Sequence, residues 1–184
     1  MSDLNHDPIV NAVHKGIKED IEFNHGHGRI RATLLLIFSA IDAMAFLNMP
    51  ASQTDVTRTD FNEWANRYLK LVDAKQLAGA DLYGARCALL HTYSSESRMS
   101  REGKCRQLMF VDALPGSPVR ETTDPEFVLV SVAALKADLF VGIDSFLVDL
   151  FASPLKAKLV EPRLRKLLIQ RPDFPGVQLQ QMLK

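Results

Sequence analysis

The stretch 29-RIRATLLLIFSAIDAMAFLN-48 decides the fold, because it is apolar almost all the way round a helix. A helix of this kind is either buried in a protein core or spans a membrane. The charges of Arg29, Arg31 and Asp42 leave about 17 uncharged positions, the lower limit for a membrane span. We therefore predict a central core helix. An isolated buried carboxylate is costly, so Asp42 needs a partner, and Arg86 is one candidate.

Helical periodicity continues on both sides of this segment. Helices are expected over 8–23, over about 59–78, over 81–93, over about 133–152, and after Ser153, with Pro162 interrupting or restarting the last one. The second of these is expected to begin at Thr59 with Asn62 and Glu63 in its first turn, and to bury Trp64, which is more typical of a core than of a base-stacking surface.

Two segments have strand character instead. Residues 105–113, CRQLMFVDA, and 127–132, FVLVSV, are rich in β-formers and bounded by turn residues. We predict a two-stranded, hairpin-like insertion over about 105–132, although 125–132 also fits the opening of the next helix with Pro125 at its first position. The expected fold is mainly α: a bundle of four to six helices with a small β insertion, one domain over 1–184, ending in a tail over about 171–184.

Composition narrows the functional classes. The chain has 184 residues, 47% hydrophobic and 24% charged, with no net charge, so it lacks the global basic excess of many nucleic-acid binders. Basic residues do gather locally, over 154–171, where they could hold RNA phosphates or form a solvated helix face. The residues in question are Lys156, Lys158, Arg163, Arg165, Lys166 and Arg171, against Glu161.

The start of the chain has no secretory signal pattern, so we expect a cytoplasmic protein outside the membrane. Cys87 and Cys105 are then expected as reduced thiols, although a disulfide between them stays open. His25 and His27 are expected in a polar loop rather than as half of a metal site, because no cysteine or carboxylate cluster completes one nearby. No metal and no cofactor are expected.

The stretch 81-DLYGARCALLHTYS-94 carries the chemistry, because it places Arg86 and His91 in an otherwise apolar helical segment. RNA can be cleaved without metal if one group removes the 2′-hydroxyl proton and another stabilises the charge that grows on the phosphate. Imidazole is a suitable general base near neutral pH, and guanidinium is a rigid cation that matches phosphate oxygens. The two side chains are roughly 140° apart around an ideal helix. A symmetric dimer that pairs this helix with its copy would bring them together.

This pattern, R-CALL-H followed by Thr92-Tyr93, resembles the R-x4-6-H mark of the HEPN superfamily in the R-x4-H-x-Y form of HepT-type toxins. The resemblance implies a HEPN-like helical bundle and a homodimeric, metal-independent endoribonuclease, such as a toxin or defence effector, with Arg86 and His91 at the dimer cleft. It also implies an antitoxin or nucleotidyltransferase partner that modifies Tyr93. The next basic side chains, Arg98, Arg101 and Lys104, are candidate phosphate contacts for RNA.

Two alternatives stand beside the ribonuclease. In family members the residue after the arginine is usually polar, and here it is Cys87, which fits a catalytically inactive HEPN-like module that binds RNA or nucleotides. In a helical interaction module, Arg86 would pair with Asp42 or Asp81 to join two helices, and His91 would favour the helix C-terminus. Asp81 would extend the cleft or simply begin its helix.

Overall fold

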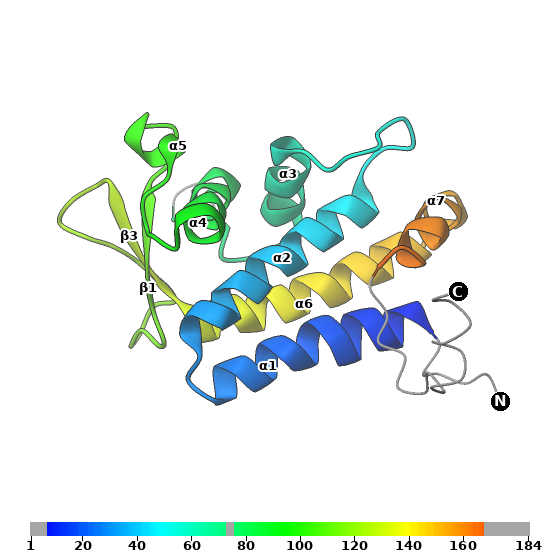
Figure 1. Cartoon of the computed structure of the whole chain (residues 1–184), viewed down its shortest axis with the longest axis horizontal. Helices are drawn as coiled ribbons and strands as arrows, with labels where there is room; N and C mark the ends of the chain where they lie inside the picture. Colours follow the sequence, from blue (N-terminus) through cyan, green and yellow to red (C-terminus); the bar gives the residue numbers. More distant parts are fainter. Residues whose placement is uncertain (1–6, 73–75, 168–184) are drawn as a thin grey trace, which may run out of the picture.

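The apolar helix of the sequence is the centre of the computed structural model, which describes residues 7–72 and 76–167 (Figure 1). This helix, α2 (Ile30–Asn48), buries nine of its residues and is the core helix that its composition predicts. The other helices are the π-helix η2 (Ile9–Lys18) with α1 (Glu19–Gly26), α3 (Arg58–Tyr68), α4 (Gly79–Thr92), α5 (Arg98–Arg101), α6 (Val132–Phe151) and α7 (Pro154–Leu164). The prediction of a mainly helical fold is confirmed.

Helix α2 is covered from several directions. It packs against α1, α3, α4, α6 and α7, and Figure 1 shows it crossing between α6, α1 and the pair α3 and α4. Among the described residues it is the one helix long and apolar enough to cross a membrane, and half of its most apolar window is buried within the protein. Because tertiary contacts cover its apolar surface, α2 acts here as a core helix.

The C-terminal end of α2 is closed by Arg163 from α7. The guanidinium donates through Nη1 to the carbonyls of Leu47 and Met49, and through Nη2 to the carbonyl of Pro50 at 2.8 Å. Arg163 is only 7% exposed, and this burial lowers its pKa. A cation at a helix C-terminus satisfies carbonyls that have no partner within the helix and favours the helix dipole.

Helix α3 is shorter than predicted. It begins after Thr57, whose side chain caps the amide of Asp60 while Asp60 bonds back to Thr57, so the cap at Thr59 was wrong by two residues. It ends at Tyr68 rather than near Ala78, because Asp138 of α6 accepts the amides of Lys70 and Leu71 and holds the chain outside a helix.

The β insertion has three strands instead of two. Strand β1 (Gln107–Val111) pairs in parallel with β3 (Phe127–Ser131), and β2 (Val119–Glu121) pairs antiparallel with the other side of β3. The hairpin-like pairing was therefore wrong, because the chain crosses over between β1 and β3. The alternative helical start at 125–132 is also excluded: Ser131 ends β3 and caps α6, accepting the amide of Ala134.

Three further predictions can be compared with the structure. Ser153 caps α7 as expected, but Pro162 lies inside α7 without ending it. The four-residue helix α5 lies where the sequence predicted neither a helix nor a strand. The predicted tail over 171–184, with Arg171, lies outside the described residues.

Replacement of Arg163 by Met should lower the free energy of unfolding by about 2–4 kcal/mol, because the carbonyls at the end of α2 lose their donors while staying buried. Urea denaturation of the variant and the wild type measures this difference. Arg165→Met is the matched control, since Arg165 is exposed and its ion pair among the described residues is with Glu161, one turn away. Its effect should stay within about 0.5 kcal/mol. Equal losses in both variants would contradict the role given to Arg163.

Candidate functional site

The two ends of α4 determine where its functional side chains lie. At its start the carboxylate of Asp81 accepts the amide of Ala78 at 3.0 Å. At its end Tyr93 adopts a left-handed backbone (φ 56°), and the amides of Tyr93 and Ser94 return to the carbonyls of Leu89 and Ala88. A left-handed residue ends a helix sharply, so His91 stands in the last turn and Tyr93 just beyond it.

Asp81 joins α4 to the sheet. Its carboxylate accepts the backbone amide of Arg106 at 2.8 Å and two guanidinium donors of the same residue at 2.8 and 3.2 Å. Asp81 is buried, and the segment before β1 lies so close to α4 that a Cβ at Gly84 would sit 2.3 Å from the sulfur of Cys105. Asp81 therefore begins its helix and holds Arg106, and it does not line the cleft described below.

Arg86 pairs with Asp42, one of the two partners considered from the sequence. Nε and Nη2 lie 2.9 and 2.8 Å from the same carboxylate oxygen, and the two side chains are 23% and 22% exposed. Burial raises the pKa of Asp42, and Arg86 opposes that shift only in part. Burial alone would lower the pKa of Arg86, but the hydrogen bond and charge of Asp42 raise it. The guanidinium also lies over the ring of Tyr83. This pair joins α4 to the core helix.

His91 opens onto a cleft of about 680 Å³ between the start of α3, the outer face of α4, and α5. The residues that line it are Thr57, Arg58, Thr59, Tyr83, Cys87, Ala88, His91, Thr92, Glu96, Ser97, Arg98, Met99 and Arg101. Arg86 is absent from this lining. Within one chain the structure therefore keeps Arg86 and His91 apart, as their spacing around the helix predicts.

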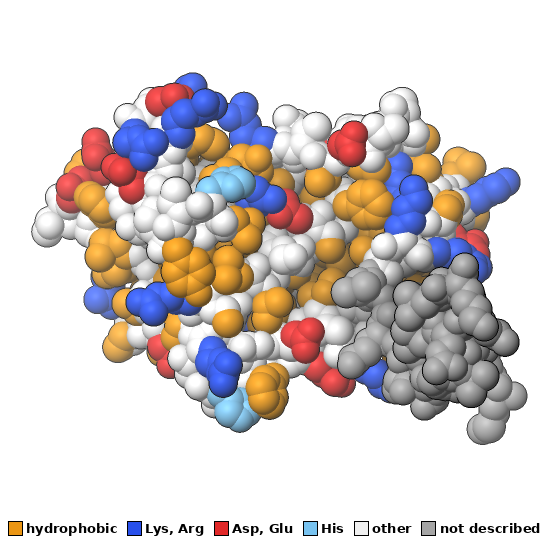
Figure 2. Space-filling model, in the orientation of Figure 1, with side chains coloured by type: hydrophobic (Ala, Val, Ile, Leu, Met, Phe, Trp, Pro, Cys, Tyr) orange, Lys and Arg blue, Asp and Glu red, His pale blue; other side chains and the backbone are white. Residues whose placement is uncertain are grey.

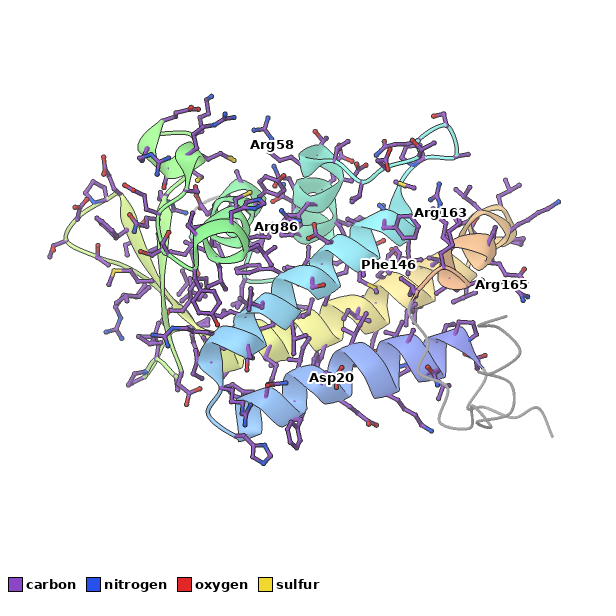
Figure 3. The ribbon with its side chains drawn as sticks, viewed as in Figure 1. Asp20, Arg58, Arg86, Phe146, Arg163 and Arg165 are labelled. Atoms are coloured by element: carbon purple, nitrogen blue, oxygen red, sulfur yellow. The ribbon has the colours of Figure 1, made fainter. Side chains whose placement is uncertain are left out.

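Three arginines face the cleft with His91. Arg98 and Arg101, both candidates from the sequence, form exposed ion pairs with Glu102 and Glu96 at 3.5 and 3.2 Å. Arg58 extends from α3 towards α5, where its Nη1 lies 4.0 Å from the sulfur of Met99, well above Arg86 (Figure 3). Within residues 7–72 and 76–167, no carboxylate pairs with Arg58. The cleft is therefore basic. Exposed ion pairs such as those of Arg98 and Arg101 contribute little to stability, so either arginine can bind another anion in place of its carboxylate.

The other sequence candidates lie elsewhere. Lys104 pairs with Glu102 at 2.6 Å outside the cleft lining. His25 bonds to Asp112 and His27 to the carbonyl of Phe23, and the described part of the chain contains no group of three metal-ligating side chains. Cys87 and Cys105 are free thiols. Arg58 was not predicted from the sequence as a site residue. The one local feature that could have drawn attention to it is its position next to the helix cap at Thr57.

Replacing either member of the Asp42–Arg86 pair should destabilise the fold more than replacing both. Arg86→Met or Asp42→Leu alone leaves a mostly buried charge without its partner and should reduce the free energy of unfolding by about 1–3 kcal/mol. The double variant should lie within about 1 kcal/mol of wild type, since apolar side chains of similar size fill the site. Urea denaturation of the four proteins gives the coupling energy. Additive losses would show that the pair does not join the helices.

Comparison with known proteins found no match: no family model, no curated protein and no solved structure is similar to this chain. The residues of the cleft and their chemistry are therefore the basis for a functional assignment.

Proposed function

We propose that the protein is a metal-independent endoribonuclease that binds RNA in the cleft between α3, α4 and α5, with His91 as its general base. One observation carries the proposal: an exposed imidazole and three arginines line the same cleft. A phosphodiester needs these two kinds of group, a base for the attacking hydroxyl and cations for the phosphate oxygens. The resemblance to the HEPN motif independently suggests this same histidine, His91, as a catalytic residue.

In the proposed reaction, His91 removes the proton from a ribose 2′-hydroxyl, whose oxygen attacks the adjacent phosphorus. The bond from phosphorus to the 5′-oxygen breaks, and the leaving oxygen takes a proton from solvent or from the imidazolium. The products are a 2′,3′-cyclic phosphate and a 5′-hydroxyl end. Arg58, Arg98 and Arg101 would hold the phosphates and stabilise the charge that develops on the oxygens.

A role for Arg86 in binding the phosphate is suggested only by the resemblance of the sequence to the HEPN motif. In one chain its Nε and Nη2 are occupied by Asp42 and it does not line the cleft. A homodimer that pairs α4 with its copy would supply Arg86 of one subunit to His91 of the other. The role of Arg86 and the dimer are thus one linked proposal.

A toxin or defence role in the cytoplasm, with an antitoxin or nucleotidyltransferase partner, remains part of the proposal. It is supported by Tyr93, whose side chain is accessible at the end of α4. The runner-up is a catalytically inactive RNA- or nucleotide-binding module, favoured by Cys87 after the motif arginine; a helical interaction module is the third candidate.

Purified protein should cleave single-stranded RNA in the presence of EDTA and leave 2′,3′-cyclic phosphate ends. His91→Ala should reduce the rate by about 10²- to 10⁴-fold through loss of the base, and Arg58→Gln by about 10²-fold through loss of a phosphate contact. Gel electrophoresis and mass spectrometry of the products measure both effects.

Lys158→Gln is the control. The basic residues of α7, considered from the sequence as RNA contacts, do not line the cleft, so this variant should cleave like wild type. Undiminished cleavage by His91→Ala would exclude the proposed site. Salt-dependent RNA binding without cleavage by wild type would favour the inactive module, and the absence of binding would favour the interaction module.

Mixing two inactive variants tests whether Arg86 acts across a dimer. If each site combines Arg86 of one subunit with His91 of the other, a refolded mixture of Arg86→Ala and His91→Ala chains should recover about a quarter of wild-type activity, because half of the dimers are mixed and each has one intact site. Cleavage rates of the mixture and of each variant alone measure this recovery. Sedimentation should show a dimer of twice 20.6 kDa. No recovery from a mixed dimer would contradict a shared site.

A further inference from the structure

A second hollow, of about 790 Å³, lies next to the end of α4. Its walls are the start of α2 with Arg29 and Arg31, the end of α4 with Tyr93, and strand β1 with Met109. Figure 2 shows hydrophobic side chains beside Lys and Arg side chains over this region between α4 and the start of α2. The hollow thus combines apolar surface with positive charge.

Two of its side chains are large apolar groups left open to solvent. Tyr93 is 60% exposed and Met109 is 45% exposed. Tyr93 is held in place by the left-handed turn that ends α4, which a bulky residue adopts rarely and only where the surrounding structure requires it. The turn sets the direction in which the side chain leaves the backbone, and the exposed ring is an accessible aromatic surface at the wall of the hollow. Nucleobases stack on surfaces of this kind.

The charge in this hollow comes from Arg29 and Arg31. Both side chains are exposed, and no carboxylate among the described residues forms an ion pair with either. Their guanidinium groups match phosphate oxygens in shape and charge. A ligand with both a flat apolar ring and an anionic backbone fits the whole lining, and a purely apolar ligand leaves the two arginines without a partner.

The two hollows flank the same helix end. His91 lines the first hollow, and Tyr93, two residues later, lines the second. A strand of RNA that crosses the end of α4 would therefore place one phosphate at His91 and the neighbouring nucleotide at Tyr93. A base can stack on a side chain only when it is unpaired, so this path excludes a continuous duplex.

We propose that the hollow beside Tyr93 binds the nucleotides next to the reactive phosphate as unpaired RNA, with a base stacked on Tyr93 and phosphates held by Arg29 and Arg31. This inference rests on the proposed function and assigns the site that holds the unpaired nucleotides of its substrate. Recognition by stacking and by phosphate contacts depends little on base identity, because every base has a stacking face. The substrate is therefore selected by strandedness more than by sequence.

The test separates binding from cleavage by using RNA that cannot react. The probe is an oligouridylate of about 12 nucleotides, 2′-O-methylated so that it has no attacking hydroxyl, with a fluorescent label. Fluorescence anisotropy measures its affinity at several salt concentrations, and the same oligomer annealed to its complement serves as the duplex. Wild type should bind the single strand at least tenfold more tightly than the duplex.

Tyr93→Asn should weaken binding of the single strand by about 5- to 150-fold, because the ring is lost while asparagine tolerates the left-handed backbone. Tyr93→Phe keeps the ring and should bind like wild type. Arg29→Gln with Arg31→Gln should weaken binding and reduce the slope of log affinity against log salt by about 1.4. Lys158→Gln with Lys166→Gln removes the same charge from α7 and the turn after it. Neither lysine lines either hollow, so this variant should change neither quantity.

The outcomes distinguish this inference from the proposed function. Wild-type affinity in Tyr93→Asn and in the Arg29 and Arg31 double variant would overturn the inference, even if cleavage still depends on His91. Loss of affinity in both would support it, even in a protein that never cleaves. A change in sedimentation mass with unchanged RNA affinity would assign the hollow to contact with a second copy and would also overturn it.

Discussion

The fold depends on covering α2 while satisfying the carboxylate of Asp42 within it. Its apolar surface requires neighbours on several sides, and these are supplied by helices from both halves of the chain. Asp42 then requires a cation at that depth, and Arg86 supplies it from α4. Because this ion pair, together with the Asp81–Arg106 contact, fixes α4, it also fixes the direction in which the last turn of α4 presents His91 and Tyr93.

Much of the helical framework could be predicted from local pattern. The start and end of α2, the place of α4 and the cap of Ser153 follow from periodicity and from residues within a few positions of each end. The end of α3 could not be predicted, because it is set by Asp138, far along the chain. Strand β2 has three residues, two of them exposed, so it shows no alternation that marks a strand. The parallel pairing of β1 and β3 is equally a property of the folded chain.

Some residues of the candidate site could likewise be predicted from the sequence and others could not. A buried carboxylate on α2 and an arginine on an apolar helix each need a partner, and that requirement alone suggested the pair of Asp42 and Arg86. Arg98 and Arg101 could be predicted as part of the cleft lining, because they follow His91 closely in sequence. Arg58 could not be predicted, since only the packing of α3 beside α4 brings it to the cleft. The division of His91 and Tyr93 between two hollows follows from the left-handed turn at Tyr93, which no local sequence signal marks.

The contact of Arg163 with the end of α2 has a consequence for the order of events during synthesis. Leu47 leaves the ribosome 116 residues before the arginine that binds its carbonyl. Until then the carbonyls of Leu47, Met49 and Pro50 lack this donor, and those without another partner are satisfied by water. A ribosome that stalls before α7 therefore produces a chain whose core helix still lacks the arginine that closes its C-terminal end.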